Sequence, residues 1–193
     1  VTGTSDYVGG LIGMVGGGVG ATSLTISKSY STGNVTGSLT CVGGLVGIIY
    51  STVDALGPYL IEDSYSRGTV FGNTGSVGGI VGLQANSLGN LVTSLSRVYA
   101  TGAVTANSGL KGGLVGAVQA GTITVTDSFW DSTTTLQATS AGTAAGATAA
   151  KTTAQMQTQA SDIFSAANWD FATTPVWKWP AASSVYPVLN WQP

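Results

Sequence analysis

The sequence predicts an all-β fold, a β-solenoid of stacked parallel strands, from three observations. The run Gly-Gly-Leu-Ile-Gly at Gly9–Gly13 recurs in near-identical form at Gly43–Gly47, Gly78–Gly82 and Gly112–Gly116, with steps of 34, 35 and 34 residues. A second motif recurs in phase with it, at Ser29–Val35, Ser64–Val70 and Val98–Val104. No copy has apolar residues at helical spacing. A fixed period in this range is typical of stacked repeats. A β-prism or a stack of hairpins is the alternative.

Each repeat contains two clear strand patterns and one weaker pattern. Leu45–Tyr50 is apolar throughout, as expected for a strand that is buried on both faces. Ile61–Ser66 alternates between apolar and polar residues, and Val35–Val42 is predicted to be a third, more polar strand. The Gly-Gly pairs between these strands let two backbones turn and approach closely, because no Cβ atoms stand in the way.

Stacking in register would place equivalent side chains about 4.8 Å apart, in columns. One column is aliphatic and consists of Leu11, Leu45, Ile80 and Leu114. Another is aromatic and consists of Tyr30, Tyr65, Tyr99 and Phe129. A third alternates in charge and consists of Lys28, Asp63, Arg97 and Asp127. We interpret the third column as a structural ladder that guides register, since each exposed pair contributes only about 0–1 kcal/mol.

The chain divides into three predicted segments. Residues 1–131 hold four repeats, of which the first is truncated, so we expect that Val1 is not a natural start and leaves an open edge. Residues 132–151 are rich in Ser, Thr, Ala and Gly and are predicted to form a linker or surface loop. Residues 152–193 are rich in Trp and are predicted to cap the exposed solenoid end. This cap should contain a short helix at Thr153–Gln159, with Thr152 or Thr153 as its N-cap, and a helical turn at Ser161–Ala166.

Composition argues against several function classes. Charged residues are only 7% of the chain and the six cations are scattered, which argues against nucleic-acid binding. The chain has no His and one Cys, Cys41, which argues against Ser-His-Asp or Cys-His catalysis, His-based metal sites and an intrachain disulfide. We expect Cys41 to be inert rather than reactive. No apolar run reaches eighteen residues, so we expect no membrane insertion, and we expect no cofactor. A Ser/Thr/Gly-rich surface suits an extracellular protein.

Two candidate binding or catalytic sites remain, each beside a structural alternative. Trp177, Trp179 and Trp191 could stack on sugar rings, or they could pack as a cap. A carboxylate pair of the kind that glycoside hydrolysis needs could come from the charged column. Its candidates are Glu62, Asp63 and Asp127, with Arg97 between the latter two.

Three weaker sites complete the set of candidates. Asp127 and Asp131 could supply oxygen ligands to a calcium ion. The alternating stretch Thr122–Thr126 has the pattern of an ice-binding strand, although in one repeat only. Asn34-Val35-Thr36 is a glycosylation sequon, which matters only if the source organism modifies Asn.

The repeats resemble GLUG motifs, whose core is seen here as Gly44-Leu45-Val46-Gly47. The companion motif at Ser29–Val35 is also typical, as is the ending, so that the resemblance covers nearly the whole chain. The matching parts of the ending are Ser128–Asp131, Thr152–Met156, Trp169–Phe171 and Tyr186-Pro187 with Leu189 and Trp191. The resemblance implies a large secreted or surface-exposed protein of bacteria or archaea, similar to adhesins of the filamentous-haemagglutinin type, and it brings no catalytic residues.

We therefore expect a non-catalytic structural or interaction module of a secreted or cell-surface adhesin or extracellular filament. Its expected partners are other copies of itself or upstream repeats, stacked end to end, and surface glycans or receptors on host or neighbouring cells. The alternatives are a carbohydrate-binding module that uses the C-terminal aromatic residues and, third, a solenoid enzyme that degrades glycans.

Overall fold

The computed structural model confirms the β-solenoid. It describes residues 1–17, 23–52, 58–142, 150–159, 162–164, 168–172, 174–181 and 185–193. We number the rungs by residue: rung 1 is 1–34, rung 2 is 35–69, rung 3 is 70–103 and rung 4 is 104–131. Equivalent strands of successive rungs pair in parallel and in register, with Thr2 opposite Thr36 and Val70 opposite both Val35 and Val104.

Each rung contributes one strand to each of four parallel sheets. The first sheet contains β1 (Thr2–Gly3), β6 (Val35–Gly37), β10 (Val70–Gly72) and β14 (Val104–Ala106). The second contains β2 (Tyr7–Gly9), β7 (Cys41–Gly43), β11 (Ser76–Gly78) and β15 (Leu110–Gly112). The third contains β3 (Ile12–Gly17), β8 (Val46–Ser51), β12 (Val81–Asn86) and β16 (Val115–Val118). The fourth contains β4 (Leu24–Ser27), β9 (Tyr59–Ser66), β13 (Val92–Ala100) and β17 (Thr122–Thr126), with β5 (Tyr30–Ser31) and β18 (Phe129–Trp130) paired to its long strands.

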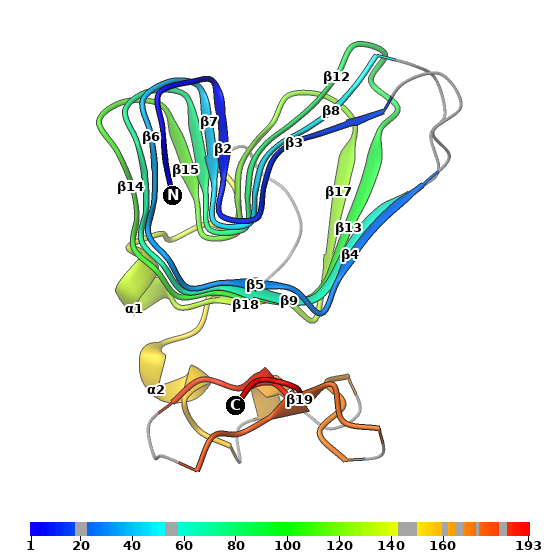
Figure 1. Cartoon of the computed structure of the whole chain (residues 1–193), viewed down its shortest axis with the longest axis vertical. Helices are drawn as coiled ribbons and strands as arrows, with labels where there is room; N and C mark the ends of the chain where they lie inside the picture. The colour runs from blue at the N-terminus through cyan, green and yellow to red at the C-terminus, as the bar shows by residue number, and fades with distance from the viewer. Residues whose placement is uncertain are drawn as a thin grey trace.

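The rungs overlie one another in Figure 1, where each traces two arms that meet at a narrow waist. The first and second sheets form one arm around a core of valines, and the third and fourth sheets form the other arm around a larger aliphatic core. β8 is buried along almost its whole length, as its apolar sequence predicted. The aliphatic column is as predicted at Leu45, Ile80 and Leu114, which are fully buried and whose backbones hydrogen-bond from rung to rung.

The Gly-Gly pairs form the waist. A Cβ atom on Gly44 would overlap both the carbonyl oxygen of Gly79 in the next rung and Oγ of Ser66 across the waist. The same relation joins Gly79 to Ala100, so small residues face glycine where the two arms touch. Glycine is therefore required at the waist for lack of space.

The predicted third strand, Val35–Val42, is wrong as a single element. It consists of β6 and β7 with a turn between them, and the chain reverses there. Val35 and Val42 both face the same valine core from opposite sheets. One continuous strand of that length could not place both side chains in that core, because it would extend away from it.

The far end of the stack, beyond rung 4, is covered by residues 131–142, which we call the closing segment. It contains helix α1 (Ser132–Thr135), capped by the carboxylate of Asp131, and a parallel bridge between Ala141 and Val115. Ser140 and Ala141 are buried. The prediction of a linker or surface loop at 132–151 is therefore corrected for residues 132–142. They form hydrogen bonds with backbone groups of the last rung that would otherwise have no partner. Residues 143–149 lie outside the described residues.

The Trp-rich segment is present, with the predicted short helix. Helix α2 (Thr153–Met156) has Thr152 as its N-cap, in a capping box with Gln155, and it ends three residues before the predicted Gln159. A 3-10 turn, η1 (Asp162–Phe164), follows within the predicted helical turn. β19 (Trp177–Lys178) and β20 (Val188–Leu189) pair antiparallel. We call residues 152–193 the aromatic tail.

The aromatic tail covers the side of the solenoid rather than its end (Figure 1). It packs on the aromatic column, from Phe129 of rung 4 to Tyr30 of rung 1. The physical reason for this position is that the column presents large rings outward from the rungs, whereas the closing segment already covers the end. Within the described residues, no helix has the length and apolar character needed to cross a membrane.

Candidate functional site

The charged column lies at a corner of each rung within the fourth sheet, two residues before the aromatic column, with Asp63 in β9 and Arg97 in β13. Its residues, the corner column, all adopt left-handed backbone conformations, with φ of 49° at Lys28, 45° at Asp63, 51° at Arg97 and 47° at Asp127. Such values are uncommon for residues other than glycine and strain Lys and Arg more than Asp. Serine hydroxyls hold the corner: Ser64 Oγ donates to the Glu62 carbonyl and accepts from the Ser29 N–H.

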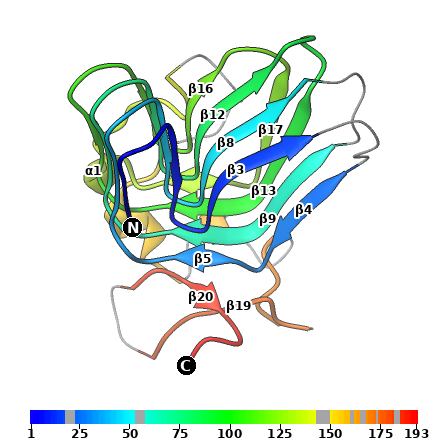
Figure 2. The same ribbon diagram turned by 45° about the horizontal axis from the view of Figure 1, so that its top comes forward.

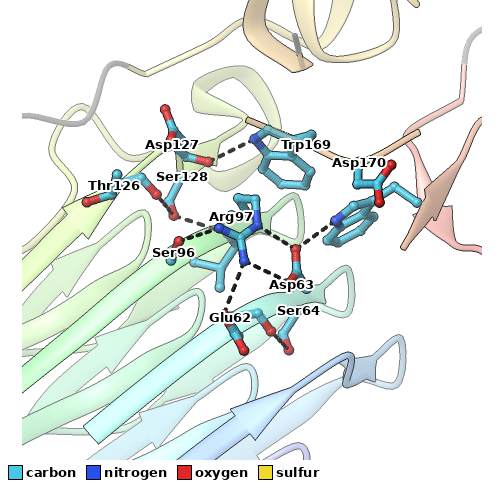
Figure 3. Close-up of polar contacts among 12 residues, drawn as sticks. Glu62, Asp63, Ser64, Ser96, Arg97, Thr126, Asp127, Ser128, Trp169 and Asp170 are labelled. Atoms are coloured by element: carbon cyan, nitrogen blue, oxygen red, sulfur yellow. Dashed lines mark hydrogen bonds and ion pairs between the residues drawn. The ribbon is translucent and has the colours of Figure 1, made fainter. Parts of the chain in front are cut away.

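One ion pair dominates the corner column (Figure 3). Arg97 holds Asp63 with two hydrogen bonds, Nε to Oδ1 at 2.7 Å and Nη2 to Oδ2 at 2.9 Å, and it reaches Glu62 Oε2 at 3.1 Å. The indole N–H of Trp177 also donates to Asp63 Oδ1, at 3.1 Å. The hydrogen bond that Arg97 donates to Asp63 is the main cause that raises the pKa of Arg97, and the negative charges of Asp63 and Glu62 add to it. Asp63 and Arg97 thus join the rungs to the aromatic tail.

The alternating ladder was predicted to pair at every step, and the described residues form only its central pair. Asp127 Oδ1 accepts a hydrogen bond from Asn168 in the aromatic tail at 2.9 Å, and the Trp169 indole donates to the Asp127 carbonyl. Lys28 is exposed and forms no ion pair with Asp63 in the described part of the chain. The reason is competition: Asp63 is already satisfied by a bidentate guanidinium and an indole.

Removal of the central cation gives a first prediction. Arg97→Met should lower the free energy of unfolding by about 3 kcal/mol, because Asp63 is largely buried and would lose its charge partner. Lys28→Met is the matched control at the equivalent corner, and it should change stability by less than about 0.5 kcal/mol. Urea unfolding of both variants measures the difference. Equal effects would contradict the central role of the Arg97–Asp63 pair.

The three predicted sugar-stacking residues differ in how far their rings are exposed. Trp177 is fully buried, so its ring faces are closed to a ligand. Trp179 is half-buried and stacks on Phe171, with ring centroids 5.9 Å apart. Trp191 is 60% exposed and lies beside Tyr30, with centroids 5.6 Å apart. Of the three, Trp191 therefore offers the open face.

The candidate carboxylate and calcium sites are occupied by structural contacts. Asp131 uses Oδ1 to cap α1 and Oδ2 to accept from the Tyr186 hydroxyl at 2.6 Å, while Asp127 binds Asn168. Among the described residues, no cluster of three acidic or cysteine side chains could hold a metal ion. Glu62 and Asp63 both face Arg97, which is the arrangement of a salt bridge.

The remaining candidates lie apart from one another. Cys41 is buried between the two arms, where desolvation raises the pKa of its thiol. The Thr122–Thr126 stretch is β17, with its threonines exposed. Asn34 is exposed, and its side-chain oxygen accepts from the Thr69 N–H at 3.1 Å.

Arg67 joins the aromatic tail to the aromatic column, a role that the sequence analysis missed. It stands where the other copies of the motif have Thr32 and Thr101, and this departure from the repeat was the available signal. Its guanidinium lies 4.8 Å from the Tyr65 ring centroid and donates to the Tyr99 hydroxyl at 2.7 Å. It also donates to the backbone carbonyls of Tyr186 and Pro187, each at 2.9 Å. Arg67 therefore clamps the aromatic tail to the column.

The tyrosines under the tail predict alkaline destabilisation. Burial is the main cause that raises the pKa of Tyr99 and Tyr65, and it raises that of Tyr186 to about 12. An unfolded tyrosine titrates near 10, so unfolding releases protons between these values. The contribution of these tyrosines to the free energy of unfolding should be constant up to about pH 10 and fall as the pH rises towards 12. Urea unfolding from pH 8 to 12 measures this, Tyr99→Phe with Tyr186→Phe should flatten the fall, and a constant free energy would contradict it.

The two ends of the stack differ. At the far end, Thr134 Oγ1 donates to the Thr101 carbonyl at 2.6 Å, and Gln137 Nε2 donates to the Val104 carbonyl at 2.7 Å. At the near end, β1, β2, β3 and β4 each stand last in their sheets, and no described segment pairs with their outer edges. Figure 2 shows this edge at the front, beside the C-terminus.

Apolar side chains are exposed at the near end because nothing described covers them. Leu11 is 47% exposed, whereas its equivalent Leu45 is fully buried. Met14 is 53% exposed, against 4% for Ile48. Val8, Val15 and Ile26 of rung 1 stay buried, so the near end exposes part of the apolar side chains that the later rungs cover.

Comparison with known proteins adds no assignment. No family model matches the chain, and neither a curated protein nor a solved structure matches it.

Proposed function

We propose that this chain is a non-catalytic structural and interaction module of a secreted or cell-surface adhesin or extracellular filament. The observation that carries the proposal is the asymmetry of the stack, which has one edge-open apolar end and one end closed by residues 131–142. A solenoid with one closed end is suited to terminate a longer rod, since terminal repeats need covers and internal ones do not.

The surface supports the same assignment. Only 7% of residues are charged, and the candidate catalytic carboxylates are engaged in contacts between rungs and tail. Backbone ladders in register and stacked side-chain columns make a stiff element that resists local unfolding. The resemblance to GLUG-motif proteins of the adhesin type points to the cell exterior.

Surface labelling tests this proposal. An antibody raised against the folded chain should decorate intact cells of the source organism by immunogold microscopy, and brief treatment of those cells with protease should remove the label. A cytoplasmic protein serves as the control for cell integrity. Label that appears only after permeabilisation would overturn the extracellular assignment.

Exposure of Trp191 supports a second candidate, a carbohydrate-binding role. Its ring and that of Tyr30 form a partly open aromatic pair, of the kind that stacks on sugar rings. A glycan array should then show binding by the parent chain that Trp191→Ala abolishes, while Trp179→Ala, which alters a ring stacked on Phe171, retains it. Absence of binding by the parent removes this candidate. Retention of binding by Trp191→Ala would place the contact elsewhere.

A further inference from the structure

We propose that the near end is a docking surface for one further rung of the same repeat, preceding Val1 on the same polypeptide and carrying an acidic residue at its corner. This inference rests on the proposed function and names the partner of the open end. The evidence comes from the unpaired backbone edge of rung 1, from the space around the turn glycines and from the charges of the corner column.

The backbone edge is ready to continue the ladder. The nitrogen of Val1 donates to the Asn34 carbonyl at 2.6 Å. Equivalent peptide nitrogens, of Val35 and Val70, donate in the same way to Thr69 and Ala103. The nitrogen of Val1 therefore occupies the position of an internal peptide nitrogen, at the point where each later rung receives the chain from the rung before it.

The turn glycines show what is missing beneath rung 1. A Cβ atom on Gly68 would overlap the Gly33 carbonyl of the preceding rung, and one on Gly102 would overlap that of Gly68. A Cβ atom on Gly33 would meet no atom within 4 Å. Glycine at position 33 thus has no steric reason among the described residues, whereas a preceding rung in register would supply the same carbonyl contact.

Charge selects the kind of rung. Lys28 is exposed at the open end of the corner column, and Asp63 on its other side is held by Arg97 and Trp177. An acidic corner residue on the added rung would continue the alternation Lys28, Asp63, Arg97, Asp127. The column of rings favours an aromatic residue on that rung as well, stacked on Tyr30 and covering Trp191.

A second copy of this chain fits the site poorly in head-to-tail order. The face that it would have to present is the far side of rung 4. Residues 131–142 already bond there to Val104 and Leu114, and they also bond to Thr101 at the end of rung 3. The occupant must be a rung that no closing segment follows. Of the two expected partners, other copies and upstream repeats, this favours upstream repeats, which continue the rod in one polypeptide.

A chain extended by one rung tests the inference. A copy of Val35–Thr69 is joined directly before Val1, so that the copied Asp63 falls beside Lys28. We expect the melting temperature to rise by about 5–10 °C and the amides of β1 to β4 to gain protection from hydrogen exchange. If the copied segment stays unprotected while the original rungs fold, the docking surface is disproved.

Position 33 provides a readout of register. In the original chain, Gly33→Ala should shift the melting temperature by no more than about 1 °C, and in the extended chain it should lower it by about 5 °C or more. Gly68→Ala, which is crowded in both chains, is the matched control and should be harmful in both. An equally small effect of Gly33→Ala in both chains would overturn stacking in register.

Charge reversal tests the acidic corner. Asp63→Lys made only in the copied rung should remove part of the gain in melting temperature, and Lys28→Asp in the same chain should restore it. An equal gain with either charge would overturn this requirement. Sedimentation velocity of the original chain should show no concentration-dependent growth, and head-to-tail oligomers would contradict the single-polypeptide occupant. All these measurements use purified protein, so their failure is distinct from failure of the surface labelling.

Discussion

Gly44→Ala is expected to lower the free energy of unfolding by at least about 3 kcal/mol. Gly44 lies at the waist, where an added methyl group would overlap the Gly79 carbonyl of the next rung and Ser66 across the waist. The Gly79 carbonyl is backbone in the ladder, so the waist has to widen to make room. Overpacking of this kind typically costs about 1–3 kcal/mol and more where no side chain can move aside.

Urea unfolding followed by far-UV circular dichroism measures this loss. Gly33→Ala is the matched control, since it introduces the same atoms in the same chain at a position with no neighbour within 4 Å. It should leave stability unchanged within about 0.5 kcal/mol. Equal urea midpoints for the two variants would contradict the claim that lack of space requires glycine at the waist. They would indicate instead that glycine is used there for its flexible backbone.

Trp130→Ala is expected to destabilise the solenoid by about 3–5 kcal/mol. Trp130 stands in the column of Ser31, Ser66 and Ala100, where small residues face the waist glycines. In the last rung the large ring lies against Gly113 and is almost fully buried, and its indole N–H donates to the Gln137 carbonyl at 2.8 Å. Ala100 fits at this position in rung 3 because rung 4 packs on it. An alanine at position 130 would leave a void under the closing segment.

Trp191→Ala is the control for this substitution, because it removes the same side chain from a site that is 60% exposed. Its effect on stability should stay below about 1 kcal/mol. Hydrogen exchange adds a specific readout: in Trp130→Ala the amides of Leu114 and Val115, which donate to Ser140, should lose protection first. Uniform loss of protection through all rungs would argue against a local closing role.

The repeat period determined the fold, and the physical reason is the geometry of parallel stacking. A step of 34 or 35 residues returns each side chain to the same column, so the order of Leu45, Ile80 and Leu114 along the sequence is also their order in space. Local signals narrowed the N-cap to Thr152 or Thr153, because a capping box involves only residues three positions apart, and the structure selects Thr152.

Other features depended on contacts that a repeat pattern does not contain. The corner column was recognised by charge, but its left-handed backbone and its single completed ion pair follow from how Arg97 and Trp177 compete for Asp63. The clamp at Arg67 depends on carbonyls more than a hundred residues away, at Tyr186 and Pro187. Such pairings have no period and no local signature.

The sequence alone thus determined the solenoid, its register and the identity of its columns, because stacking converts spacing along the chain into position in space. Only the tertiary structure decided which segment covers which surface. Residues 131–142 close the far end because their backbone hydrogen-bonds to that of Leu114 and Val115. The aromatic tail lies along the side because it buries there the rings of Tyr65 and Tyr99, which point outward from the rungs. The open near end, with its exposed Leu11 and uncrowded Gly33, is the consequence that carries the proposed function.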